Sequence, residues 1–290
     1  MDKTKSIDII CPLYNAEIYL ENFVEAIEKQ TIYNQVNNIR FAITESKDKT
    51  LEKVQELAKK NKKIIYKEIK KEDFSHSLTR ETEAREANAD IIVFITQDVK
   101  VKKENWLENL VKPIEKNEVQ ATYSRQLCTN NTIEKYTREC NYPKESKIVS
   151  KEDINKLGLK TFFFSDASGA INRKIFNELN GYDEKRLPIS EDMYFAYKLI
   201  MNGYKIEYCA DSEVMHSHTF TLKQIYDRYK LTGKFFKQNS YLDKYGTNGS
   251  GWTLAKYVLK RAFQEHNIKV IFRWLPDMTA RYLGMKEGKR

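Results

Sequence analysis

The sequence predicts an α/β protein whose mainly parallel sheet is flanked by helices. Short apolar segments rich in β-branched residues alternate with longer segments whose apolar residues recur at helical spacing. This alternation indicates βαβ units, in which a helix returns the chain to the start of the next parallel strand. The clearest strand, at residues 91–95, is apolar at every position, as expected for a strand buried on both faces.

The elements are expected in a regular order along the first 210 or so residues. The first strand is predicted at residues 7–11 and is expected to stop at Pro12, because proline lacks a backbone N–H. Further strands are expected at 39–43, 64–66, 91–95, 119–123 and 204–209, and helices at 20–27, 51–58, 78–89, 107–114, 171–179 and 190–201. Residues 124–165 are less regular, and we interpret them as an insertion that shapes a pocket.

The net charge of +9 is concentrated near the C-terminal end of the chain. Residues 219–290 contain 15 Lys and Arg against 5 Asp and Glu, a net charge of +10, whereas residues 1–218 contain 35 against 36. The same last quarter holds 13 of the 35 aromatic residues. We therefore predict a domain at 1–218 and a basic, aromatic-rich helical region at 219–290, in which Pro276 is expected to kink or end a helix.

Several classes of protein are disfavoured by the same sequence. The four cysteines form no CxxC pair and no apolar run approaches the roughly 20 residues of a membrane span, so a reduced, cytoplasmic protein is expected. The chain enters a strand-like segment near its start, so no signal peptide is predicted. GxGxxG and GxxxxGK[S/T] loops are missing, and the uneven charge argues against nucleic acid as a partner.

Polar residues follow three of the predicted strands at the points where these strands end. Tyr14-Asn15 follow the first strand, residues 45–48 follow the second, and Thr96-Gln97-Asp98 follow the buried strand at 91–95. In an open α/β sheet, ligands bind outside the carboxyl ends of the strands. Each segment alone is ordinary loop chemistry, but together they predict a single binding cleft.

These segments resemble, in order, the motifs of family 2 glycosyltransferases with the GT-A fold, and more closely their rhamnosyltransferase-like branch. The resemblance covers about residues 6–235 and rests on Cys11-Pro12-Leu13-Tyr14-Asn15-Ala16, Thr44-Glu45-Ser46-Lys47-Asp48-Lys49-Thr50, Phe74-Ser75-His76-Ser77-Leu78-Thr79-Arg80, Thr96-Gln97-Asp98, Gly181-Tyr182-Asp183-Glu184, Ser190-Glu191-Asp192, Gly203-Tyr204 and His216-Ser217-His218. Two residues depart from the family pattern. Glu45 stands where Asp is usual, and Thr96 replaces the first Asp of the DxD motif, as is common in the branch.

The resemblance implies an enzyme that transfers a sugar from a nucleoside diphosphate with inversion, using Mn²⁺ or Mg²⁺. It implies that Asp98 and His216 hold the metal, with His218 as a second candidate, and a carboxylate with an imidazole suits such an ion. Asp192 matches the catalytic base, and Glu191 is expected to position the acceptor or the base. The residues expected at the nucleotide-sugar site are Pro12, Tyr14, Asn15, Glu45, Asp48, Arg80, Gln97, Asp98 and Asp166.

Structural alternatives exist for three of these assignments. Ser190-Glu191-Asp192 is also a good helix start, in which the Ser190 hydroxyl would cap free N–H groups. Arg80 is alternatively an exposed helical residue that pairs with Glu83 at i+3. Glu45 is alternatively part of an ordinary polar turn.

The function expected is transfer of L-rhamnose from dTDP-L-rhamnose to a glycan or polyprenyl-linked acceptor in cell-surface polysaccharide synthesis. The alternative from another class is a non-catalytic scaffold that retains the fold and binds a carbohydrate or a nucleotide. Residues 219–290 are expected to bind a membrane surface or a lipid pyrophosphate, which would place the protein at the inner face of the cell membrane. A helical subdomain that packs on the sheet domain or forms a homodimer is the alternative for this region.

Overall fold

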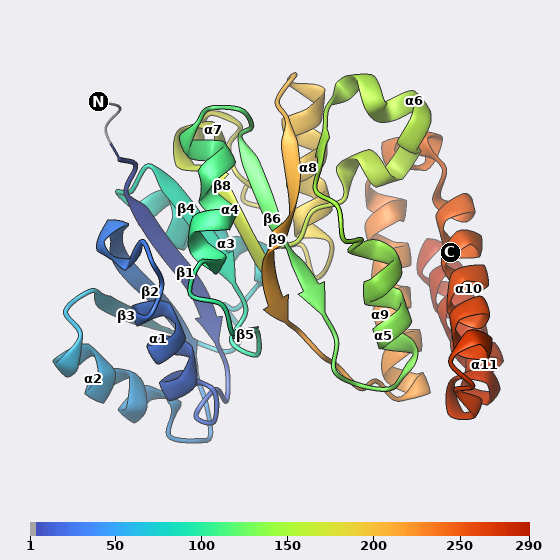
Figure 1. The fold of residues 1–290 in the computed structure, drawn as a ribbon, viewed down its shortest axis with the longest axis horizontal. Coiled ribbons are helices and arrows are strands. Elements are labelled where there is room, and N and C mark those ends of the chain that lie inside the picture. Colours follow the sequence, from blue (N-terminus) through green and yellow to red (C-terminus); the bar gives the residue numbers. More distant parts are fainter. Residues whose placement is uncertain (1–3) are drawn as a thin grey trace.

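The computed structural model describes residues 4–290, apart from the side chains of residues 247–250. In this part of the chain, helices lie against both faces of one curved sheet (Figure 1). The strands are β1 (Ile7–Leu13), β2 (Val36–Thr44), β3 (Ile64–Ile69), β4 (Ile91–Ile95), β5 (Lys100–Val101), β6 (Ala121–Leu127), β7 (Lys147–Val149), β8 (Ser168–Asn172) and β9 (Ile206–Met215). The α-helices are α1 (Leu20–Glu28), α2 (Thr50–Lys60), α3 (His76–Glu86), α4 (Trp106–Glu115), α5 (Ile133–Asn141), α6 (Ile154–Leu157), α7 (Arg173–Glu178), α8 (Glu191–Met201), α9 (Leu222–Gln238), α10 (Thr247–Gln264) and α11 (Ile268–Lys289).

Most strands of the sheet run in one direction, which confirms the predicted α/β fold. The strand order is β3-β2-β1-β4-β8-β6-β9-β5, with β7 paired to β9. Pairs β1–β2, β2–β3, β1–β4 and β6–β9 are parallel, and β8 runs antiparallel between β4 and β6. The short strands β5 and β7 also run antiparallel to β9. As a result, β1, β2, β4, β6 and β9 all end at the same edge of the sheet.

Strand β4 is buried on both faces, as its sequence predicts. Ile91, Val93 and Ile95 pack into a core cluster that includes residues of α1, α2 and α4. Ile92 and Phe94 point the other way, into a cluster that includes residues of α3, α7 and α8, because side chains alternate along a strand. All five side chains are 0% exposed, and burial of each contributes about 1.5–3 kcal/mol. This rigid strand fixes the position of residues 96–98.

The element boundaries expected at Pro12 and at residue 171 are wrong. Pro12 lies inside β1, where it is in register with Ala42 of β2, so the strand does not stop there. The helix expected at 171–179 begins only at Arg173, because residues 171 and 172 belong to β8. Asn172 then caps that helix, since its side chain accepts a hydrogen bond from the Ile175 N–H. Pro276 lies inside α11 and does not end it, so a kink at this position stays a prediction.

The C-terminal quarter is helical and forms one outer side of the molecule (orange to red in Figure 1). Phe235 and Phe236 of α9 belong to the second core cluster, so α9 is packed into the main core. Helices α10 and α11 meet α5 in a third cluster, which consists of Ile133, Tyr136, Val258, Ala262 and Val270. A domain boundary at residue 218 therefore stays a proposal. Over the described residues, no helix combines the length and the apolar composition needed to cross a membrane.

Helices α9 and α11 approach each other closely through glycines. A Cβ atom at Gly233 of α9 would lie 2.5 Å from the carbonyl oxygen of Met285 and 2.9 Å from the Cα of Gly288. Gly284 and Gly288 of α11 likewise face the backbone of α9. The two helices can pack this tightly only because these positions carry no side chain.

Substitution Gly233→Ala is expected to lower the free energy of unfolding by about 1–3 kcal/mol, because the new methyl group must push the two helices apart. The matched control is Gly251→Ala in α10, where an added Cβ meets no atom within 4 Å. Alanine there should be neutral or stabilising by up to about 1 kcal/mol. Equal melting temperatures for the two variants would contradict the tight packing.

Candidate active site

The ends of the parallel strands bring most of the predicted site residues to one edge of the sheet. Tyr14 follows β1, Glu45 follows β2, Asp98 closely follows β4 and His216 follows β9. These ends point toward the lower side of the molecule in Figure 1. Asp166 precedes β8 and reaches the same edge, because β8 runs in the opposite direction.

Asp98, His216 and His218 form a group that can hold a metal ion. The Oδ2 atom of Asp98 lies 3.6 Å from His216 Nε2 and 3.6 Å from His218 Nδ1. One ligand atom from each of the three residues lies within 4.8 Å of the others. One carboxylate and two imidazoles are a suitable donor set for a divalent transition metal. The structure thus brings together both histidines that the sequence offered as alternatives.

The protonation states of this group also suit metal binding. Burial alone would raise the pKa of Asp98, but the hydrogen bond and charge of His216, together with His218, lower this pKa to about 2. Burial and the neighbouring His216 lower the pKa of His218. At neutral pH an ionised carboxylate therefore faces a neutral imidazole of His218, and both are in the form that coordinates a cation.

Gln126 orients the His216 ring and was not predicted from the sequence. Its Oε1 atom lies 2.9 Å from His216 Nδ1 and also accepts a hydrogen bond from Arg138, while its Nε2 donates to Ser165 Oγ at 2.8 Å. An amide oxygen at Nδ1 fixes the proton there, so that Nε2, which lies 2.7 Å from His218 Nε2, is the ring atom that carries the lone pair. The predicted strand at 119–123 stopped short of Gln126, whereas β6 continues to Leu127.

Arg80 is buried and pairs with Glu191, contrary to its expected structural alternative. The Arg80 side chain is 3% exposed, and its Nη1 atom lies 3.0 Å from Glu191 Oε1 at the start of α8. Glu83, the partner expected at i+3, instead pairs with Arg40 and Lys67. The expected contact of Arg80 with a pyrophosphate stays a prediction, but its Nη1 is already engaged.

Three carboxyl groups gather around Arg80, and burial raises the pKa of two of them, Asp166 and Asp192. Burial, and then the charges of Glu191 and Asp166, raise the pKa of Asp192 well above its ordinary range. Burial likewise raises the pKa of Asp166 to about 7, although Arg80 lowers it and the Tyr182 hydroxyl donates to its Oδ2 at 2.6 Å. Asp166 Oδ1 is buried without a hydrogen-bond partner. A carboxylate with a raised pKa is a suitable general base near neutral pH.

The start of α8 is not a serine-capped helix terminus. Ser190 adopts a left-handed backbone conformation with φ of 63°, and its side chain makes no capping hydrogen bond. Such a conformation in a non-glycine residue is strained and is enriched at functional sites. The capping alternative for Ser190-Glu191-Asp192 is therefore wrong, and Asp192 Oδ1 accepts only from the N–H of the next residue, at 2.7 Å.

Side-chain amides connect the ends of β1, β2 and β4. Gln97 accepts from the Tyr14 N–H at 2.7 Å and donates to the Tyr14 carbonyl oxygen at 2.9 Å. Asn15 Oδ1 accepts from the Lys47 N–H at 2.9 Å, and the Asn15 N–H donates to Ser46 Oγ at 3.0 Å. These bonds hold the three loops in a fixed arrangement at the edge of the sheet.

The acidic loop after β2 has one engaged and one exposed carboxylate. Asp48 accepts hydrogen bonds from the N–H and hydroxyl of Thr50 and from the N–H of Glu17, at 2.5–3.1 Å, so it stabilises the turn. Glu45 is exposed, and its Oε2 accepts only a long bond of 3.3 Å from the Lys71 N–H. Their contacts with a nucleotide, like that of half-buried Pro12, stay predictions.

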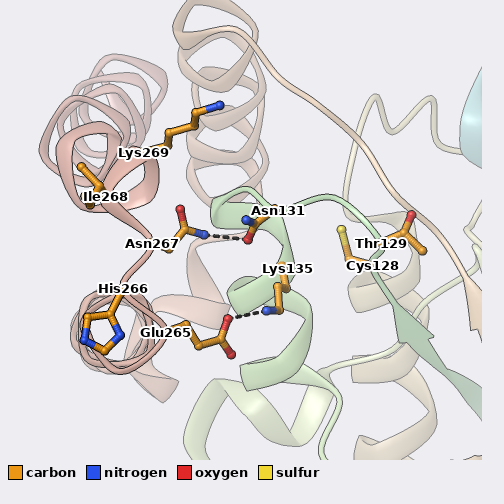
Figure 2. A pocket seen from close by; sticks show the side chains of 9 residues that line it. All are labelled: Cys128, Thr129, Asn131, Lys135, Glu265, His266, Asn267, Ile268 and Lys269. Atoms are coloured by element: carbon orange, nitrogen blue, oxygen red, sulfur yellow. Dashed lines mark hydrogen bonds and ion pairs between the residues drawn. The ribbon is translucent and has the colours of Figure 1, made fainter.

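A cavity of about 510 Å³ lies beside the loop that follows β6. Figure 2 shows that side chains of this loop and of α5 face the turn between α10 and α11. Its polar groups largely bond to one another, since Lys135 pairs with Glu265 and Asn267 Nδ2 donates to Asn131 Oδ1 at 2.7 Å. None of the predicted site residues lines this cavity, which is instead part of the joint between α5 and the C-terminal helices.

Two known proteins are similar to this chain over nearly its whole length. The O-antigen chain rhamnosyltransferase RfbN of Salmonella typhimurium is 34% identical to this chain over 292 residues, which cover 98% of this chain and 89% of RfbN. The O-antigen chain rhamnosyltransferase WbaN of Salmonella anatum is 33% identical over 294 residues, which cover 98% of this chain and 89% of WbaN.

A solved structure shares the fold at low sequence identity. The mannosyltransferase PcManGT from Pyrobaculum calidifontis, in complex with GDP-Man and Mn²⁺, superposes with a TM-score of 0.66 at 15% identity, over 99% of this chain and 87% of that protein. The fold is thus the expected GT-A fold. The model of the family described as glycosyl transferase family 2 matches residues 8–179. With this match and two near-full-length relatives, the chain belongs to glycosyl transferase family 2.

Proposed function

We propose that this glycosyltransferase moves a sugar from a nucleoside diphosphate to an acceptor hydroxyl with inversion, with Asp192 as the general base. The proposal is supported by a three-donor group that can hold a metal at the carboxyl edge of the sheet, together with the raised pKa of Asp192. A non-catalytic scaffold would need neither. The rival function is therefore disfavoured by the chemistry that the site retains.

In the proposed reaction, Asp192 accepts the proton of the acceptor hydroxyl as its oxygen attacks the anomeric carbon of the donor sugar. The bond from this carbon to the diphosphate breaks, and its electron pair leaves with the nucleoside diphosphate. A single displacement from the opposite side inverts the anomeric centre. Glu191, held by Arg80, keeps the start of α8 and therefore Asp192 in position.

The proposed metal ligands are Asp98, His216 and His218. The chemistry that a divalent metal such as Mn²⁺ would supply there is neutralisation of the charge on the leaving diphosphate. Only one carboxylate is present in the group, so oxygens of the donor diphosphate are proposed to complete the coordination. Nucleotide and metal should therefore bind cooperatively.

The proposed donor is dTDP-L-rhamnose, and the proposed acceptor is a glycan or a polyprenyl-linked glycan. Support comes from the two relatives, which are named O-antigen chain rhamnosyltransferases and match nearly the whole chain. A lipid-linked acceptor would place the enzyme peripherally at the inner face of the cell membrane. The nucleotide loops proposed to hold the donor include Tyr14, Asn15, Glu45, Asp48 and Gln97.

Donor turnover tests the function directly. Wild-type protein with Mn²⁺ should release dTDP from dTDP-L-rhamnose in the presence of acceptor, in preference to the corresponding release from UDP- or GDP-sugars. Asp192→Asn should lower kcat by about 10²–10⁴-fold, because the acceptor proton loses its carboxylate base. Thermal shifts by dTDP should be the same in both proteins. Nucleotide binding without turnover in the wild type would instead favour the scaffold.

The pH dependence tests the base. Since the pKa of Asp192 is raised by burial and by its acidic neighbours, kcat/KM should fall as the pH decreases through a value well above that of an ordinary aspartate. Asp166→Asn removes one of these neighbouring charges and should move the acidic limb to lower pH. The exposed Asp211→Asn is the matched control and should leave the limb in place. An unmoved limb in Asp166→Asn would argue against this electrostatic coupling.

The metal group is tested by a residue that does not touch the metal. Gln126→Leu removes the acceptor at His216 Nδ1 and should weaken Mn²⁺ binding in the presence of dTDP by about 10–100-fold, measured by calorimetry. Gln120→Leu is the matched control. Gln120 also accepts a hydrogen bond, from the Lys205 N–H, but it lies just before the start of β6, whereas Gln126 lies near the end of that strand. Equal Mn²⁺ affinities of the two variants would contradict the proposed ligand set.

A further inference from the structure

Helix α11 exposes a continuous row of apolar side chains to solvent. Five large apolar residues share one face of this helix, because four of them recur at spacings of four, three and seven residues and the fifth is next to the last of these. They are Ile268, Phe272, Leu275, Tyr282 and Leu283. Phe272 is 79% exposed and Tyr282 is 65% exposed. We call these five residues the outer stripe.

The outer stripe is not required for packing within the chain. The opposite face of α11 already carries buried residues, including Val270, Asp277, Gly284 and Gly288. That inner face contacts α9 through glycines and α5 through the third core cluster. A soluble protein rarely leaves so many large apolar side chains on one surface unless the surface meets a partner.

Two neighbouring helices extend the apolar surface. In α10, Trp252 is 68% exposed and Phe263 is exposed on the same helical face as the exposed Lys256 and Lys260. In α9, Leu222 and Tyr226 line an apolar groove of about 550 Å³ together with Leu275 and Leu283 of the outer stripe. Exposed apolar side chains and exposed lysines thus occur on both α10 and α11, which lie on the outer side of the molecule (Figure 1).

The charge of this region selects among the partners that an apolar surface could bind. Exposed Lys286 and Arg290 continue the face of the outer stripe toward the C-terminus, and residues 219–290 carry a net charge of +10. A second copy of the chain would bring an equal positive charge to the contact, which opposes self-association. An anionic lipid surface instead offers an apolar layer beneath negative headgroups, and it matches both features at once.

We propose that the outer stripe of α11, with Trp252 and Phe263 of α10, inserts into the headgroup region of an anionic bilayer. Phe272, Leu275 and Trp252 enter the acyl boundary, while Lys256, Lys260 and Lys286 contact lipid phosphates. This proposal rests on the proposed function only for the purpose of the membrane contact, which is to hold the enzyme beside a lipid-linked acceptor. The physical contact itself does not require turnover.

Vesicle flotation of the full-length protein tests the surface. Wild-type protein should float with vesicles of equimolar phosphatidylglycerol and phosphatidylcholine, and much less with phosphatidylcholine alone or at high salt. The double variant Phe272→Ser and Leu275→Ser keeps the net charge and should reduce partitioning by about tenfold or more, because two exposed apolar side chains no longer enter the bilayer. Ile148→Ser in β7 removes an exposed apolar residue elsewhere and should leave partitioning unchanged.

Three further readouts keep the test decisive. Thermal melting should show that the double variant folds like the wild type, since both side chains are exposed. Turnover with a soluble glycan acceptor should be the same in the double variant as in the wild type. If the proposed function is wrong, the wild type will show no turnover but will still float with anionic vesicles. Light scattering should show a monomer. Unchanged flotation of the double variant, or a wild-type dimer that dissociates in it, would overturn the proposal.

Discussion

One buried cation, Arg80, determines how the carboxyl groups of this site can coexist. It lies among Glu191, Asp166 and Asp192, which together carry more negative charge than a single guanidinium can balance. Burial, together with the charge of neighbouring carboxyl groups, raises the pKa of Asp166 and Asp192, and a raised pKa suits Asp192 to its proposed role as general base. Loss of the arginine would leave buried charge unpaired, at a cost of about 3–5 kcal/mol.

The rest of the site is organised to keep its groups from moving. Gln97 joins the turn after β1 to the end of β4, and Asn15 joins the same turn to the loop after β2. The Gln126 amide holds the ring of His216 in one orientation. Because amides carry no charge, they fix geometry without disturbing the electrostatics that Arg80 and the metal group establish. Groups held in advance lose little entropy when substrate binds.

The sequence predicts much of the fold because burial leaves a periodic pattern. Fully apolar β4 and the helices with one apolar face were located correctly, and the order of motifs placed Asp98 and the two histidines. Strand β8 was missed, since Ser-Gly-Ala-Ile-Asn has no strong strand signal and its pairing depends on residues far along the chain. Gln126 was missed for a similar reason: its role exists only when β6 and β9 are adjacent.

The arrangement of the proposed metal ligands depends more on the length of the segment 216–218 than on which residue separates its two histidines. Residues two apart on extended backbone point to the same side, so both imidazoles face Asp98, while the intervening Ser217 hydroxyl meets Thr129 in the loop after β6. A threonine at position 217 would keep this hydroxyl contact with Thr129. Inserting or deleting a single residue there would rotate one imidazole away and shift the register of everything that follows, including α9.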